Sequence, residues 1–253
     1  MSDTKTNKVI VNVVLDRSGS MNSTRESTIE GYNEYIQGLR ADKDSEYWVT
    51  LTQFDAPMTV PELTITYADR ALADVPALTA AEYQPRGNTP LYDAIGECVR
   101  RVDAKDRAVI VLIITDGMEN ASTEFTKDSV KALIKQKELK GWTFAFLGAN
   151  IDSYAVGGSV GVAAMNIANY AQGNESLLYR NLAQSTMARA VAYRSVGIEA
   201  AVSMEFFDDN QRKQMGSLPN HPLGGRPAAP RRFRSRIPKR RVWTVNSSPL
   251  PRS

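Results

Sequence analysis

The sequence of 253 residues contains only one cysteine, Cys98, and one histidine, His221. A lone cysteine cannot form an internal disulfide, and secreted domains seldom leave a free thiol, so we expect a reducing, cytoplasmic location. We interpret Cys98 as a small core residue, because it falls on the apolar stripe of an expected helix. Since His221 lies near the C-terminus, the preceding residues offer no imidazole for a general base or a zinc ligand.

Long hydrophobic runs are also missing. The first apolar run, residues 9–15, is interrupted by Asn12 and is too short to span a membrane, and the polar start of the chain lacks a signal-peptide pattern. Two enzyme motifs are absent: a Walker P-loop and a D-x-D after the first strand. The glycine-rich run 157–161 resembles a phosphate loop only superficially, and we interpret it as a turn.

Charge is divided unevenly along the chain. Residues 217–253 hold eight Arg, one Lys and no acid, a net charge of +9, whereas the preceding 216 residues have a net charge of −6. The same segment holds seven of the 12 prolines and shows no helical or strand periodicity, so we expect it to be disordered. The sequence thus predicts a flexible N-terminus (1–7), a folded domain (8–216) and a basic tail (217–253).

The basic stretch 231–241 allows several interpretations. Its arginines and Phe233 would suit phosphate contacts and base stacking on a nucleic acid. A solvated tail, a tether that folds back on the acidic domain and a change of reading frame near the 3′ end are the alternatives.

Apolar runs alternate with helical periodicity over the first 200 residues. Residues 9–15 and 108–114 are typical of strands buried on both faces; 46–54 and 142–147 indicate two more, and 62–67 a weaker edge strand. Apolar stripes predict four helices, at 29–39, 91–102 (with Thr89 as N-cap and Pro90 at the first position), 130–137 and 175–196. The last stripe consists of Leu178, Leu182, Met187 and Val191. This alternation predicts an α/β fold: a doubly wound, mostly parallel sheet with helices on both faces.

Oxygen-bearing side chains follow the two most strand-like runs. Asp16, Ser18 and Ser20 form D-x-S-x-S after the first run, where Gly19 would add backbone freedom, and Asp116 follows the other. Thr89 precedes a predicted helix, and ligands of such sheets bind beyond the carboxyl ends of the strands. Two carboxylates and three hydroxyls suit Mg²⁺ or Mn²⁺. Three further polar residues are candidates for the rim of this site: Asp55, Glu119 and Asn120.

These residues resemble the signature of the von Willebrand factor A (vWA) family and its metal-ion-dependent adhesion site. That signature consists of D-x-S-x-S after the first strand, a threonine in a middle loop and an aspartate after the fourth strand. Residues 8–147 carry the resemblance, and phrases such as RGNTPLYDAIG and ITDGMENAS suit the short stand-alone bacterial and phage members. The tail lies outside it.

The resemblance implies a Rossmann-like fold and a set of metal ligands. Ser18, Ser20 and Thr89 would contact the ion, and Asp16 and Asp116 would hold it directly or through water. It also implies an open coordination position filled by an Asp or Glu of a protein partner. Many short bacterial relatives act beside a AAA+ ATPase of the MoxR type, so such an ATPase is an implied partner.

Three classes of function follow. We expect a cytoplasmic, metal-dependent protein interaction module that is not an enzyme. The alternative is a phage or bacterial structural or nucleic-acid-associated protein, virion-associated if phage-encoded, that binds through its basic tail. A metal-dependent hydrolase is favoured least, because the expected site lacks a general base.

Overall fold

The computed structural model describes residues 4–149, 151–171 and 173–216. Six strands form one sheet in the order β3-β2-β1-β4-β5-β6. All neighbouring strands run parallel except β3, which pairs antiparallel with β2 at one edge. The strands are β1 (Lys8–Asp16), β2 (Glu46–Asp55), β3 (Glu62–Ala71), β4 (Ala108–Thr115), β5 (Thr143–Ala149) and β6 (Ile167–Tyr170).

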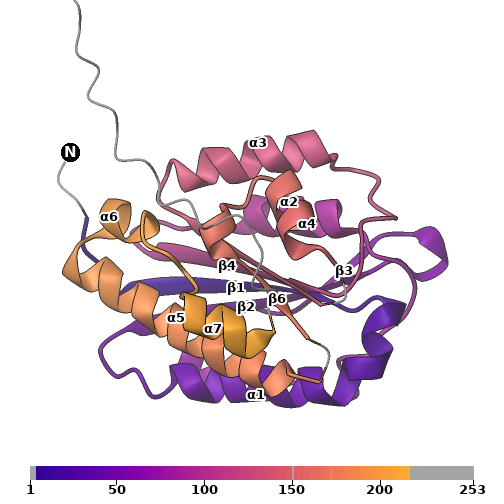
Figure 1. Ribbon diagram of the computed structural model, residues 1–253, viewed down its shortest axis with the longest axis horizontal. Coiled ribbons are helices and arrows are strands. Elements are labelled where there is room, and N and C mark those ends of the chain that lie inside the picture. The colour runs from indigo at the N-terminus through magenta and orange to yellow at the C-terminus, as the bar shows by residue number, and fades with distance from the viewer. Residues whose placement is uncertain (1–3, 150, 172, 217–253) are drawn as a thin grey trace, which may run out of the picture. The chain divides into compact units, whose positions relative to one another are not determined.

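Helices cover both faces of this sheet (Figure 1). On one face lie α2 (Leu91–Arg101), α3 (Lys127–Glu138) and α4 (Ser153–Ser159). On the other lie α1 (Arg25–Leu39), α5 (Glu175–Ser195) and α7 (Asp209–Met215), with the short α6 (Ile198–Val202) following α5. The described residues also form four 3-10 segments: Gly19–Thr24, Pro57–Thr59, Leu72–Asp74 and Ala164–Asn166.

The central strand β1 divides the core into two halves. Its side chains alternate, so that Val9, Val11, Val13 and Leu15 join the cluster that contains α1 and α5. Ile10 and Val14 join the cluster beneath α2, α3 and α4. Both faces are buried because helices cover each of them, which explains why this strand is a nearly continuous apolar run.

The doubly wound, mostly parallel sheet expected from the sequence is confirmed. The five predicted strands and four predicted helices are present, and the weak strand at residue 62 lies at the sheet edge as expected, although it extends to Ala71. Four short elements, β6, α4, α6 and α7, are not predicted from the sequence, because each has seven residues or fewer and carries too little periodicity.

Three local predictions are wrong. The N-cap of α2 is Pro90 rather than Thr89, because the helix begins at Leu91. Part of the predicted turn at 157–161 is helical, because α4 ends only at Ser159. Val160 and Gly161 form the turn, and Gly161 has φ +96°. Val191 is 45% exposed, and the inner face of α5 presents Ala190 instead.

Several predictions concern residues outside the described ranges. The tail 217–253, including its expected disorder, His221 and the basic stretch, lies there. The N-terminal segment is described from Thr4, whose carbonyl accepts a hydrogen bond from Ile198 N, and Thr6 N donates to Tyr193 O. None of the helices in the described residues has the length and apolar character needed to cross a bilayer.

Close packing between α1 and α5 generates a stability prediction. A Cβ on Gly31 would lie 2.1 Å from a ring carbon of Tyr179, which is buried against it. We expect Gly31→Ala to lower the free energy of unfolding by about 2 kcal/mol, because overpacking outweighs the gain in helix propensity.

The matched control is Gly158→Ala in α4, where an added Cβ meets no atom within 4 Å. We expect this variant to be neutral or more stable by about 0.5 kcal/mol. Urea unfolding followed by circular dichroism measures both, and equal midpoints for the two variants would contradict the packing argument.

Candidate metal site

Three loops meet at the carboxyl edge of the sheet. β1 ends at Asp16 and its neighbour β4 ends at Thr115, with Leu15 in register with Ile114, so the residues that follow both strands emerge side by side. The loop before α2 brings Thr89 to the same edge, where its carbonyl accepts a hydrogen bond from Asn120 N in the loop after β4.

The two serines link the two carboxylates through hydrogen bonds. Ser18 N donates to Asp16 Oδ1 over 2.6 Å, and the hydroxyls of Ser18 and Ser20 lie 3.1 Å apart. Ser20 Oγ then donates to Asp116 Oδ1 over 2.5 Å. Alternate residues of D-x-S-x-S therefore face a common point, together with the aspartate that lies 96 residues further along the chain.

Thr89 and Thr115 complete the group of oxygens. A Cβ built on Gly117 would lie 2.7 Å from Thr89 Oγ1 and 3.5 Å from Asp16 Oδ2, so the threonine hydroxyl and the carboxylate face the same small volume. Thr115 Oγ1, which the sequence analysis did not single out, donates to Asp16 Oδ2 over 2.5 Å. The structure thus brings together all five residues predicted from the sequence.

Burial disfavours the charged form of both carboxylates in this group. Asp16 is fully buried, and burial raises its pKa to about 6, although hydrogen bonds from Thr115 and Ser18 act in the opposite direction. Burial also raises the pKa of Asp116, against the hydrogen bond from Ser20. Within the described residues, no Lys or Arg side chain forms an ion pair with either carboxylate.

The donor set consists of oxygen atoms only. Carboxylate and hydroxyl oxygens are ligands that Mg²⁺ and Mn²⁺ prefer. In the described ranges no cluster of three or more His, Cys, Asp or Glu side chains is placed to hold a metal, so soft or multi-carboxylate sites are not found there. The arrangement fits a hard divalent cation, whose charge would offset the burial of the two carboxylates.

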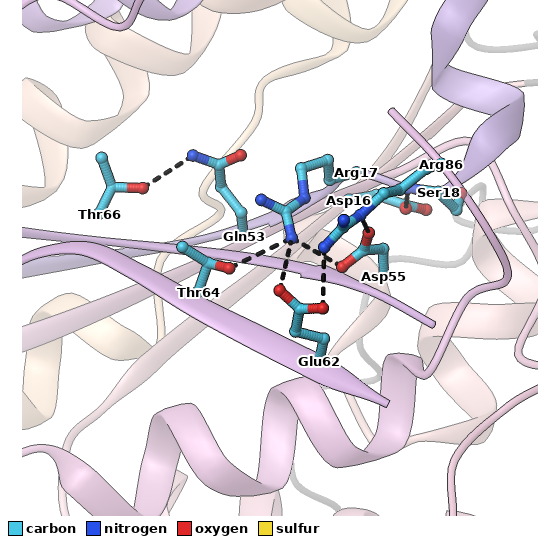
Figure 2. A network of polar contacts seen from close by, with 9 residues as sticks. All are labelled: Asp16, Arg17, Ser18, Gln53, Asp55, Glu62, Thr64, Thr66 and Arg86. Atoms are coloured by element: carbon cyan, nitrogen blue, oxygen red, sulfur yellow. Dashed lines mark hydrogen bonds and ion pairs between the residues drawn. The ribbon is translucent and has the colours of Figure 1, made fainter. Parts of the chain in front are cut away.

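A second network of charges lies beside this site (Figure 2). Asp55 is fully buried and its two oxygens bind different arginines: Arg17 Nη2 lies 2.7 Å from Oδ1, and Arg86 Nε lies 2.6 Å from Oδ2. Arg17 also donates to Thr64 Oγ1, and Arg86 pairs with Glu62 over 2.8 Å. Because Arg17 stands between Asp16 and Ser18, this network fixes the loop that carries the serines.

Main-chain bonds reinforce the same junction. Arg17 N donates to Phe54 O, Arg86 N to Arg17 O and Gly19 N to Gly87 O, over 2.8, 2.8 and 3.0 Å. Gly87 adopts φ +65°, and a Cβ there would lie 2.4 Å from Ala56 O, so this position requires glycine. Gly19 is not among the residues with positive φ, so its expected conformational freedom is wrong, and its role is the close approach to Gly87.

The three rim candidates have different roles. Asp55 is the centre of the ion-pair network described above. Glu119 accepts from the backbone N–H groups of Tyr92 and Ser122, so it caps the start of α2 and shapes its own loop. Asn120 Oδ1 accepts from Thr89 N over 2.8 Å and positions that threonine. The sequence placed these residues near the edge of the sheet but could not show which partners each one has.

Comparison with known proteins places the fold. No family model matches the sequence, and no curated protein matches it. Among solved structures, the vWF domain of the type V pili tip protein Mfa5 from Porphyromonas gingivalis aligns with 74% of this chain and 97% of its own, at 11% identity and a TM-score of 0.54. The fold is that of a von Willebrand factor A domain.

Two further structures share the vWA fold. The pilus adhesin SpaC from Lactobacillus rhamnosus GG aligns with 72% of this chain and 30% of its own, at 12% identity and a TM-score of 0.53. Proximal thread matrix protein 1 of the mussel byssus gives 11% identity, 71% of this chain and a TM-score of 0.51, and the match spans about half (48%) of that protein. At such identities the likeness concerns the fold alone.

The buried carboxylate of Asp55 generates a second stability prediction. Asp55→Ala removes the buried carboxylate that binds the Arg17 side chain, itself 8% exposed, and leaves it only Thr64 and the half-exposed Glu62, 3.7 Å away, so we expect the free energy of unfolding to fall by about 3 kcal/mol. Asp106→Ala is the control, because it removes an exposed pair with Lys8, and we expect no resolvable change. Urea midpoints measure both, and a near-neutral Asp55→Ala would show that the network does not hold the loops.

Proposed function

We propose that this chain is a vWA-family domain with a metal-ion-dependent adhesion site, and that it acts as a protein interaction module. Its ligands for Mg²⁺ or Mn²⁺ are Asp16, Ser18, Ser20, Thr89 and Asp116. A bound divalent cation would supply positive charge and an exchangeable coordination position. A carboxylate from an Asp or Glu of the partner would fill that position, and no bond would be broken.

The observation that carries this proposal is the unbalanced pair of carboxylates. Asp16 and Asp116 are 0% and 9% exposed and share a hydroxyl-lined volume without an ion-pairing side chain among the described residues. Asp55 follows Phe54, the residue in register with Asp16 on the neighbouring strand, and it forms ion pairs with two arginines. The fold pairs one buried carboxylate with arginines and leaves two others without a positive partner among the described residues. Binding of a cation at those two would offset the cost of burying their charge.

The chemistry of the site favours binding over catalysis. Hydroxyl and carboxylate ligands hold a cation, but a hydrolase also needs a group that takes or gives a proton. Asp16 and Asp116 would be engaged with the cation, and the chain up to residue 216 has no histidine. We therefore favour a non-enzymatic role, with residues 8–216 as the binding domain in the cytoplasm of a bacterium or in a phage, and a MoxR-type ATPase among its candidate partners.

The first test of the proposal is stabilisation by metal. Mg²⁺ at about one hundred times its dissociation constant should add about 2.7 kcal/mol to the free energy of unfolding, because it binds only the folded chain. For a chain of this size, that corresponds to a rise in melting temperature of about 5 to 10 °C relative to EDTA. Differential scanning calorimetry measures it.

Asp116→Asn should abolish this metal-dependent rise. Its melting temperature in EDTA should equal or exceed that of the wild type, because one unpaired carboxylate is removed. Asp128→Asn is the matched control, since Asp128 is exposed at the start of α3, and it should keep the full rise. Equal melting temperatures for the wild type in Mg²⁺ and EDTA would contradict the proposed site.

The second test concerns the partner. The full chain, the Asp116→Asn variant and the Asp128→Asn variant serve as baits in extract from the native host, each in Mg²⁺ and in EDTA. We expect the partner proteins to be retained only by the wild type and Asp128→Asn, and only in Mg²⁺, because the partner carboxylate needs the ion. Partners that bind equally to all baits in both buffers would contradict the proposal.

Binding through the basic tail is the second candidate function. The net charge of +9 on residues 217–253 favours nucleic acids or other polyanions. In the same experiment, this function predicts nucleic acid that is retained in EDTA, is released as salt rises and is lost when the chain ends at Gly216. These outcomes separate it from the metal-dependent partner.

A further inference from the structure

A cavity of about 300 Å³ lies on the α2 face of the sheet, away from the candidate metal site. Its floor is formed by the middle of β1 and β2, and its wall by the last turn of α2. Residues of the metal site do not line it. Among its lining residues are Ile10, Asn12, Thr52, Ile65, Cys98 and Val102.

Asn12 is the unusual residue of this cavity. It interrupts the apolar run of β1, lies between two paired strands and is only 2% exposed. Its Nδ2 has no hydrogen-bond partner. Buried amide donors are normally satisfied, because an unpaired one loses its hydrogen bonds to water without compensation. The Asn12 side chain on the cavity floor makes no hydrogen bond within the described residues, so its amide is open to a ligand that carries a neutral polar group.

The threonines of β2 show the same local change in polarity. Phe54, further along this face, packs into the apolar cluster with residues of α2. Toward the cavity the corresponding positions are Thr50 and Thr52, the latter 4% exposed. Hydroxyls thus replace apolar side chains where the strand faces the cavity, while Ile10, Ile65 and Val102 keep its walls apolar.

The charged residues around the cavity are already paired. Arg107 Nη1 and Nη2 donate to the two carboxylate oxygens of Asp69 over 2.5 and 3.0 Å, and the guanidinium group stacks over the ring of Trp48. Arg101 donates to Glu97 over 2.5 Å. Burial raises the pKa of Cys98 to about 12, so its thiol is neutral. The lining therefore offers hydrogen bonds but no unpaired cation for an anionic ligand.

We propose that this cavity binds a small neutral molecule with an apolar body and an amide-type group that hydrogen-bonds to the side chains of Asn12 and Thr52. A volume of about 300 Å³ is at the lower end of the range for small-molecule sites. The ligand enters independently of the metal site, so the inference holds whether or not the chain binds a cation.

Benzamide is a suitable probe, because it joins an apolar ring to a neutral carboxamide. The full, isotope-labelled chain is titrated with benzamide and, separately, with benzoate, in EDTA and in Mg²⁺, and backbone amide shifts are followed by NMR. We expect saturable shifts at Asn12, Thr52 and Cys98 with benzamide in both buffers, and weaker binding of benzoate. Absence of saturable shifts at these residues, or equal binding of benzoate, would overturn the proposal.

Variants identify the group that binds. Asn12→Leu and Thr52→Val should each weaken benzamide binding roughly 5-fold, the usual contribution of one hydrogen bond. Thr66→Val is the matched control: Thr66 precedes Tyr67 on β3, its hydroxyl accepts from Gln53, and it does not line the cavity, so the affinity should be unchanged. An Asn12→Leu chain that folds and binds benzamide as tightly as the wild type would contradict the role of the amide. If Asn12→Leu does not fold, the benzamide affinity of Thr52→Val decides, and an unchanged affinity would contradict the proposed site.

Discussion

The carboxylate of Asp55 is the interaction on which the carboxyl edge of this sheet depends. Each of its oxygens binds an arginine from a different loop, Arg17 from the loop after β1 and Arg86 from the loop before α2. Because the arginines flank the serines on one side and Thr89 on the other, one buried acid sets the distance between both loops. Moving either loop away would separate a buried carboxylate from an arginine, and an unpaired buried charge costs several kcal/mol of folding free energy. The ion pairs therefore hold both loops in place without a bound ligand.

Positive side chains are distributed unevenly at this edge of the sheet. Asp55 has surplus positive neighbours, whereas Asp16 and Asp116 have hydroxyls and no ion pair among the described residues. Arginine cannot move between these sites, since Arg17 is fixed by Asp55, Thr64 and main-chain bonds. The edge therefore keeps two buried carboxylates, without an ion pair among the described residues, available to a small cation.

The sequence predicts most of the fold because the central strands are buried on both faces and their apolar runs are unmistakable. It fails where the signal is not local. The D-x-S-x-S motif marks Asp16 as a ligand candidate, but the sequence does not show that Asp55 is an ion-pair centre, because its partners Arg17 and Arg86 lie far from it along the chain. Val191 looks like a core residue, but the helix phase set by packing places Ala190 inward. Asp16, Ser18 and Ser20 could be predicted as site candidates from one short motif, and Thr89 and Asp116 from their places beside predicted elements, whereas the contacts that support them could not.

The most direct measurement of the central claim is anomalous diffraction from crystals of the full chain grown with Mn²⁺, which scatters strongly and takes the same ligands as Mg²⁺. We expect one strong peak at the carboxyl edge of the sheet, about 2.2 Å from the hydroxyls of Ser18 and Ser20, with Asp116 in direct or water-mediated contact. A peak only elsewhere, or a well-ordered edge without a peak at saturating Mn²⁺, would contradict it.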